Sequence, residues 1–210
     1  MPLKQEQRLE TGTTTVGLVC KDCVILASES KSTMGYLIAS KTSEKVYQVD
    51  DKIAITTAGG AGDTQAIIRL MRAEISLYKM NRSNEFTVKA ASTLLSNILQ
   101  GNRYYPLMAM LIIGGVDKNG YHIYSLDPVG GGEEDDYTST GSGSPMAYGV
   151  LEDGYKKDMS REEGIKLAVR SIRSARERDI FSGGKNIVVA VIDKNGLEFV
   201  QKERIDEIAK

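Results

Sequence analysis

The chain has 210 residues, of which 41% are hydrophobic, and its 27 basic and 28 acidic side chains leave a formal net charge of −1. This length suits one domain with a sizeable core, and the balanced charge gives no sign of a nucleic acid or a membrane surface as partner. No apolar stretch approaches the roughly 20 residues of a membrane span, and residues 1–10 lack the apolar core of a secretory signal, so we expect a cytoplasmic protein.

The first quarter of the chain predicts two β-hairpins. Apolar and β-branched residues alternate on both sides of a short charged turn in each hairpin, and the glycine-rich run 59–62 ends the last strand. The expected strands are residues 13–20, 23–30, 45–49 and 53–58.

Two helices are expected after these hairpins. Asp63 can cap the first helix, Thr87 begins the second, and in both helices apolar residues recur on one face. The residues of these apolar faces are Ile67, Leu70, Met71, Ile75 and Tyr78 in the first helix, and Val88, Ala91, Leu95, Ile98 and Leu99 in the second.

The second half of the chain predicts two more hairpins with a helix pair between them. The tetrapeptide Asp-Lys-Asn-Gly occurs at 117–120 and again at 193–196, each time between strand-like runs. One helix is expected at residues 144–155 and another at 160–178, where Ser160 and Glu163 form a capping box.

The order of these elements predicts the fold class. Strands, two helices, strands, two helices and strands follow one another without a linker. Each helix pair must cover an apolar face, so we expect an α+β protein, a four-layer α-β-β-α sandwich of two antiparallel sheets with helix pairs outside.

Thr13 is the first candidate for catalysis, because a cut at the Gly12–Thr13 junction would make it the first residue. An N-terminal threonine carries a hydroxyl nucleophile and an α-amine with a pKa of about 7.7–8, which can act as its base. Read alone, the run of three threonines at 13–15 is more typical of a β-strand than of a catalytic site.

Such a nucleophile needs activation and donors for the oxyanion. The ammonium of Lys45 can favour the alkoxide of Thr13, and Glu29 can hold that ammonium by its opposite charge. Three glycine-rich runs, at 57–60, 140–144 and 182–184, allow backbone N–H groups to approach a ligand closely. None of these features is specific by itself.

The motifs from Thr13 onward, taken in order, resemble the β-subunit family of the archaeal 20S proteasome. These motifs are the threonine run at residues 13–17, the strand with Lys45 at residues 45–50, the pair Ala58-Gly59, the serine-rich loop at residues 139–144 and the loop with Asp179 and Ser182 at residues 178–184. The resemblance implies the N-terminal-nucleophile hydrolase fold and a threonine endopeptidase that degrades unfolded proteins to short peptides. It also implies that residues 1–12 form a propeptide removed by self-cleavage at Gly12–Thr13, and that 13–210 form a single catalytic domain.

The resemblance also implies the roles of the site residues. Thr13 is the nucleophile, Lys45 and Glu29 activate it, the Gly59 N–H donates to the oxyanion, and a hydrogen-bonded network surrounds the Thr13 amine, formed by Ser142, Asp179 and Ser182. Many members have aspartate where this chain has Glu29, which is one methylene longer. The pocket for the residue before the cut is expected to be lined by Ser32, Ser43, Tyr47, Thr57, Ala61 and Gln65, and the small Ala61 suggests a broad, hydrophobic-leaning preference.

The partners implied by the resemblance are proteasome α subunits, other β subunits in two heptameric rings (α7β7β7α7), an ATPase regulatory ring and unfolded polypeptides. No metal or cofactor is required by the implied chemistry.

Other functions are compatible with parts of the sequence. The chain can be a catalytically silent β-ring scaffold, a bacterial two-ring relative, or another N-terminal-nucleophile hydrolase acting on a small amide. A redox or metal-binding module would depend on Cys20 and Cys23, but the chain has no second cysteine pair, and His122, the only histidine, is expected to be structural.

Overall fold

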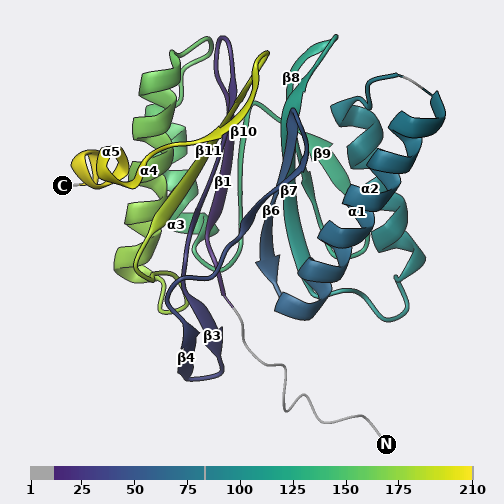
Figure 1. Cartoon of the computed structure of the whole chain (residues 1–210). Helices are drawn as coiled ribbons and strands as arrows, with labels where there is room; N and C mark the ends of the chain where they lie inside the picture. Colours follow the sequence, from purple (N-terminus) through teal and green to yellow (C-terminus); the bar gives the residue numbers. More distant parts are fainter. Residues whose placement is uncertain (1–11, 83, 210) are drawn as a thin grey trace, which may run out of the picture.

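Two antiparallel sheets, stacked face to face, form the centre of the computed structural model, which describes residues 12–82 and 84–209 (Figure 1). The expected leader, residues 1–12, lies outside the described residues except for Gly12. The first sheet has the strand order β10-β1-β2-β11-β12, with β1 Thr15–Val19, β2 Val24–Glu29, β10 Tyr137–Thr140, β11 Ile187–Asp193 and β12 Gly196–Phe199. The second has the order β5-β6-β7-β8-β9, with β5 Val46–Asp50, β6 Ile53–Gly59, β7 Ala109–Asp117, β8 Gly120–Leu126 and β9 Gly132–Glu134.

Helix pairs cover the outer faces of both sheets. The second sheet is covered by α1 Ala61–Arg82 and α2 Val88–Gly101, and the first by α3 Ser144–Gly154 and α4 Arg161–Arg178 (Figure 1). The last helix, α5 Lys202–Ile208, contributes Ile205 to the core under α4. The expected α-β-β-α sandwich is confirmed.

The hydrophobic core has three parts, as four layers require. Buried side chains fill the space between the sheets, for example Leu26 against Ile112 and Ile123, and two further clusters lie between each sheet and its helices. Each fully buried leucine or isoleucine contributes roughly 1.5–3 kcal/mol relative to exposure, so the sandwich is stabilised mainly by these interfaces.

The expected helix starts are partly confirmed. The Thr87 hydroxyl accepts a hydrogen bond from the Ala90 N–H at 3.1 Å, and Ser160 and Glu163 form both bonds of the capping box. The expected cap at Asp63 is wrong, because α1 already begins at Ala61. Asp63 lies in its first turn, and its carboxylate accepts a bond from the Met108 N–H at 2.8 Å.

Two residues expected on the apolar face of α1 are partly exposed. Leu70 is 40% exposed and Tyr78 is 37% exposed, whereas Ile67, Met71 and Ile75 are buried. The face that contacts the sheet is therefore narrower than the sequence predicts, because α1 packs on a sheet edge next to β5 and β6.

Several short elements were not expected from the sequence. They are the hairpin β3 Ser32–Met34 and β4 Leu37–Ser40, the strands β9 and β10, and helix α5. The hairpin projects from one end of the sandwich (Figure 1). Strands of three or four residues carry too little periodicity to be recognised without the tertiary structure that completes them.

Cys20 and Cys23 are free and buried in the core between the first sheet and its helices. His122 contacts Glu134, with 2.6 Å between His122 Nδ1 and the nearer carboxylate oxygen. Among the residues described, no helix has both the length and the apolar character that crossing a membrane would need.

We expect a substitution at Gly164 to measure how tightly α4 packs on the first sheet. A Cβ at Gly164 would lie 2.4 Å from Cys20 Sγ and 2.6 Å from Ile25 Cδ1, so Gly164→Ala should lower the free energy of unfolding by about 1–3 kcal/mol in urea denaturation. Gly149→Ala in α3 is the control, because a Cβ there meets nothing within 4 Å and should stabilise by about 0.5–1 kcal/mol. Equal effects of the two substitutions would contradict this packing.

Candidate active site

Thr13 lies directly before β1, and strand pairing places its neighbours. Because β1 pairs antiparallel with β2 and with β10, the start of β1 lies beside the ends of both strands, with Thr15 opposite Ser28 on one side and Thr140 on the other. Glu29 ends β2, and the loop containing Ser142 follows β10. The strand pairing thus brings two other segments of the chain, the end of β2 and the loop after β10, to Thr13.

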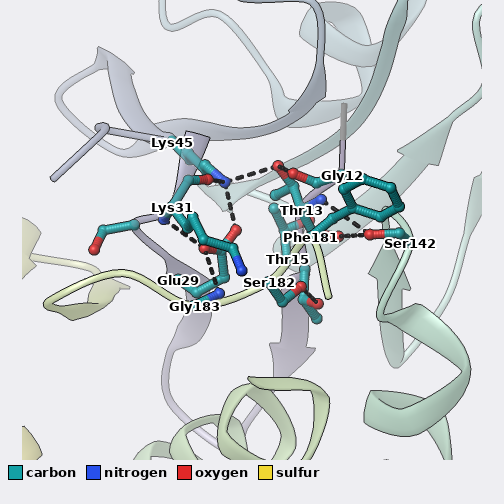
Figure 2. A network of polar contacts seen from close by, with 12 residues as sticks. Gly12, Thr13, Thr15, Glu29, Lys31, Lys45, Ser142, Phe181, Ser182 and Gly183 are labelled. Carbon is teal, nitrogen blue, oxygen red and sulfur yellow. Dashed lines mark hydrogen bonds and ion pairs between the residues drawn. The ribbon is translucent and has the colours of Figure 1, made fainter. Parts of the chain in front are cut away.

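Lys45 reaches Thr13 from the other sheet. It precedes β5, and its Nζ donates to Thr13 Oγ1 at 2.8 Å and to the Glu29 carboxylate (Figure 2). Thr13 is 4% exposed, Lys45 6% and Glu29 0%. The hydroxyl therefore contacts a buried ion pair that links the two sheets.

The second oxygen of Glu29 is also fully engaged. Glu29 Oε2 accepts hydrogen bonds from the backbone N–H groups of Lys31 at 2.6 Å and Gly183 at 3.0 Å. These donors compensate for the removal of the carboxylate from water and fix its orientation toward Lys45.

Burial lowers the pKa of Lys45 below its ordinary value of 10.5, and the negative charge of Glu29 partly opposes this effect. A lowered pKa increases the fraction of Lys45 that is a neutral amine at physiological pH, and the neutral amine can accept a proton.

A second network surrounds the Thr13 nitrogen. The Thr13 N–H donates to Ser142 Oγ at 3.2 Å, and the Ser142 hydroxyl donates to Asp179 Oδ2 at 2.6 Å. The Ser182 hydroxyl donates to the same carboxylate oxygen at 2.6 Å and lies 2.6 Å from the Thr14 hydroxyl. The three residues expected around the Thr13 amine thus form one connected network.

Gly12 presents its carbonyl to the Thr13 hydroxyl. Thr13 Oγ1 donates to Gly12 O at 2.6 Å. A Cβ on residue 12 would lie 2.0 Å from Phe181 Cβ and 2.4 Å from Ser142 Oγ, so glycine is the residue that fits here.

A cavity of about 350 Å³ opens beside Thr13. Its lining includes Gly12, Thr13 and Lys45 as well as Gly59, which has a φ of +136° at the end of β6 and leaves no room for a Cβ against Met108 O. All six residues expected to form the specificity pocket also line it: Ser32, Ser43, Tyr47, Thr57, Ala61 and Gln65.

Some site residues were missed by the sequence analysis. Thr33, Glu44 and Thr64 line the cavity as well, and the Lys31 and Gly183 N–H groups hold Glu29. A contact made by the backbone cannot be read from the type of residue, although the glycine-rich run 182–184 is one of the three that we expect to let backbone N–H groups approach closely. Within the described ranges, no group of three or more histidine, cysteine or acidic side chains is placed to hold a metal ion.

The chain is similar to known proteins over most of its length. The sequence model of a family described as "Proteasome subunit" matches residues 9–192. The proteasome subunit beta of Methanosarcina mazei is 55% identical over 195 residues, which cover 92% of both chains. That of Methanosarcina barkeri is 56% identical over 198 residues (94% of this chain and 93% of the relative), and that of Methanocaldococcus fervens 54% over 199 residues (94% and 88%).

The buried ion pair gives a stability prediction. Lys45→Met leaves the buried Glu29 carboxylate without its cation and should lower the free energy of unfolding by about 3–5 kcal/mol. Lys79→Met breaks the more exposed pair with Asp50 and should cost less than about 1 kcal/mol. Urea denaturation of both variants measures these changes in the free energy of unfolding. A similar decrease in the two variants would contradict the greater contribution expected of the buried pair.

Proposed function

Because this chain belongs to the proteasome subunit family and is a 20S proteasome β subunit, we propose that it is a threonine endopeptidase that cleaves its own Gly12–Thr13 bond. The observation that carries this proposal is the position of Thr13 Oγ1. It lies 2.6 Å from the oxygen of the Gly12 carbonyl and 2.8 Å from Lys45 Nζ, so the hydroxyl contacts both the carbonyl group of the bond to be cut and the residue proposed to take its proton.

Self-cleavage follows from these contacts. The neutral amine of Lys45 accepts the hydroxyl proton while Thr13 Oγ1 forms a bond to the Gly12 carbonyl carbon, and the negative charge develops on Gly12 O. When the C–N bond breaks, the proton passes to the Thr13 nitrogen and Gly12 stays attached to Oγ1 as an ester. Water then hydrolyses the ester, which yields a leader ending in Gly12 and a free Thr13 amine.

The freed amine allows the same hydroxyl to cleave substrates. Attack on a substrate carbonyl gives an acyl ester, the Thr13 amine returns a proton to the leaving group, and it then activates the water that hydrolyses the ester. Ser142 orients the nitrogen, since it already accepts the Thr13 N–H and is itself held by Asp179. Ser182 holds Asp179 from the other side. We assign to the Gly59 N–H the role of hydrogen-bond donor to the oxyanion, because Gly59 lines the same cavity as Thr13.

The proposal includes the state and assembly of the chain. Residues 1–12 are removed as a propeptide and 13–210 form the catalytic domain. The chain assembles into the proteasome core with other subunits, as two heptameric β rings between α rings (α7β7β7α7). An ATPase ring supplies unfolded polypeptides, and the particle works in the cytoplasm. The names of the relatives and the family match support the assembly.

Self-cleavage is tested by intact mass and N-terminal sequencing of the chain purified with α subunits. We expect the wild-type chain to begin at Thr13, and Thr13→Ala to keep its leader and to lose peptidase activity. Thr93→Ala, on the exposed side of α2, is the control and should behave as the wild type.

A wild-type chain that keeps residues 1–12 in the assembled particle would contradict the enzymatic proposal for that state. A catalytically silent scaffold would then be the better description of the chain.

The lowered pKa of Lys45 predicts the pH dependence of self-cleavage. The rate should increase with pH along a limb whose midpoint lies below 10.5, because the neutral amine is the base. Glu29→Gln removes the charge that raises this pKa, so the midpoint should move to lower pH while the maximal rate falls. Glu74→Gln, on the exposed side of α1, should leave the profile unchanged, and a midpoint moved upward by Glu29→Gln would refute the assignment of Lys45.

A further inference from the structure

Gly12, the last residue of the expected leader, lies in a narrow slot between two side chains. A Cβ on Gly12 would lie 2.0 Å from Phe181 Cβ and 2.6 Å from Phe181 Cγ, and 2.4 Å from Ser142 Oγ. The Gly12 carbonyl oxygen accepts the hydrogen bond from Thr13 Oγ1 at 2.6 Å. The backbone of Gly12 is therefore enclosed by Phe181 and Ser142 while its carbonyl group contacts the hydroxyl of Thr13 (Figure 2).

Asp179 fixes both walls of this slot. Its Oδ1 accepts a hydrogen bond from the Phe181 N–H at 3.2 Å, and its Oδ2 accepts one from the Ser142 hydroxyl at 2.6 Å. One buried carboxylate thus links the loop that follows β10, which carries Ser142, to the loop that follows α4, which carries Phe181. The slot is therefore a feature of the folded site and does not depend on the leader.

The segment around Phe181 is held on both sides. After it, the Ser182 hydroxyl donates to Asp179 Oδ2 at 2.6 Å, and the Gly183 N–H donates to Glu29 Oε2 at 3.0 Å. Phe181 itself is partly buried, whereas the preceding Ile180 is 73% exposed. Because the residues beside it are bound to the carboxylates of the site, the Phe181 side chain has a defined position against Gly12.

A contact of this kind matters for a glycine next to a bond that reacts. Glycine adopts more backbone conformations than any other residue, so an unrestricted Gly12 carbonyl could turn away from the Thr13 hydroxyl. Groups that are already held in the geometry of attack react faster, because the entropy of orienting them has been lost beforehand. The missing Cβ of Gly12 allows Phe181 to approach closely, and this approach restricts the glycine.

We propose that Phe181 is a positioning residue for self-cleavage, which holds the Gly12 carbonyl in the orientation in which Thr13 Oγ1 attacks its carbon. This inference rests on the proposed cleavage at Gly12–Thr13. Phe181 does not belong to the described residues that line the cavity beside Thr13, and the glycine that it contacts leaves with the leader. Its contribution to self-cleavage should therefore exceed its contribution to the cleavage of peptides.

The test follows self-cleavage with time, by intact mass, after the purified precursor chain is mixed with α subunits. Phe181→Ala should slow self-cleavage about 10- to 100-fold, because a misplacement of about 1 Å can reduce a rate by this much. Phe181→Leu keeps a Cβ and a Cγ against Gly12 and should restore most of the rate. Ile180→Ala, in the same loop, is the matched control and should behave as the wild type, since that side chain is exposed.

A second measurement separates positioning from general damage to the loop. In particles whose β chains all begin at Thr13, the kcat/KM of Phe181→Ala on a fluorogenic peptide should change much less than its rate of self-cleavage. An equal loss in both assays, or self-cleavage of Phe181→Ala at the wild-type rate, would overturn the positioning role and leave the endopeptidase in place.

A double-mutant cycle tests the contact between the two residues. Gly12→Ala should slow self-cleavage, because its Cβ would meet Phe181 Cβ, and Phe181→Gly removes that atom. Ser142 Oγ still opposes the new Cβ, so we expect Gly12→Ala to slow the Phe181→Gly chain less than the wild type without restoring the full rate. Equal slowing in the two backgrounds would overturn the inference. If wild-type particles keep residues 1–12, the proposed self-cleavage itself fails, and this inference fails with it.

Discussion

The ion pair between Lys45 and Glu29 is the interaction on which the site depends. It crosses from one sheet to the other, it is buried, and it ends at the hydroxyl of Thr13. A buried charge is tolerated only when it is paired and hydrogen-bonded, so the pair requires the Lys31 and Gly183 N–H groups as well as the close stacking of the sheets. The same burial lowers the pKa of Lys45 and so gives the residue its proposed role as base.

The fold supplies this arrangement by antiparallel pairing. The first strand lies between β2 and β10, so the ends of both neighbours converge on its start. One neighbour ends with Glu29, and the other leads into the loop with Ser142, whose hydroxyl links the Thr13 nitrogen to Asp179. A single strand terminus thereby carries two separate networks, one at the oxygen of Thr13 and one at its nitrogen.

The fold could be predicted from the sequence where the signal is local and repeated. The hairpin turns, the capping box at Ser160 and the apolar face of α2 are such signals, and the layers follow from their order. The strands β3, β4, β9 and β10 were missed because their pairing depends on the rest of the sheet or on a projecting hairpin. The prediction that Asp63 caps α1 is wrong, because its carboxylate accepts a hydrogen bond from the Met108 N–H outside the helix instead of from the first N–H groups of α1.

No single residue of the candidate site is specific enough to predict its role. The roles could be predicted because the motifs occur in the same order as in the family that the chain resembles. The sequence predicts Lys45, Ser142 and Asp179 as site residues, and the structure brings them to Thr13. The sequence does not predict that Glu44 and Thr33 line the cavity, because they come together with the other polar lining residues only in the folded chain. The most direct test of the account is reaction of the assembled particle with a peptide vinyl sulfone, followed by peptide mapping. The account predicts one adduct, on the Thr13 oxygen, that is lost in Lys45→Ala; an adduct on Cys20 or Cys23, or an unchanged adduct in that variant, would contradict it.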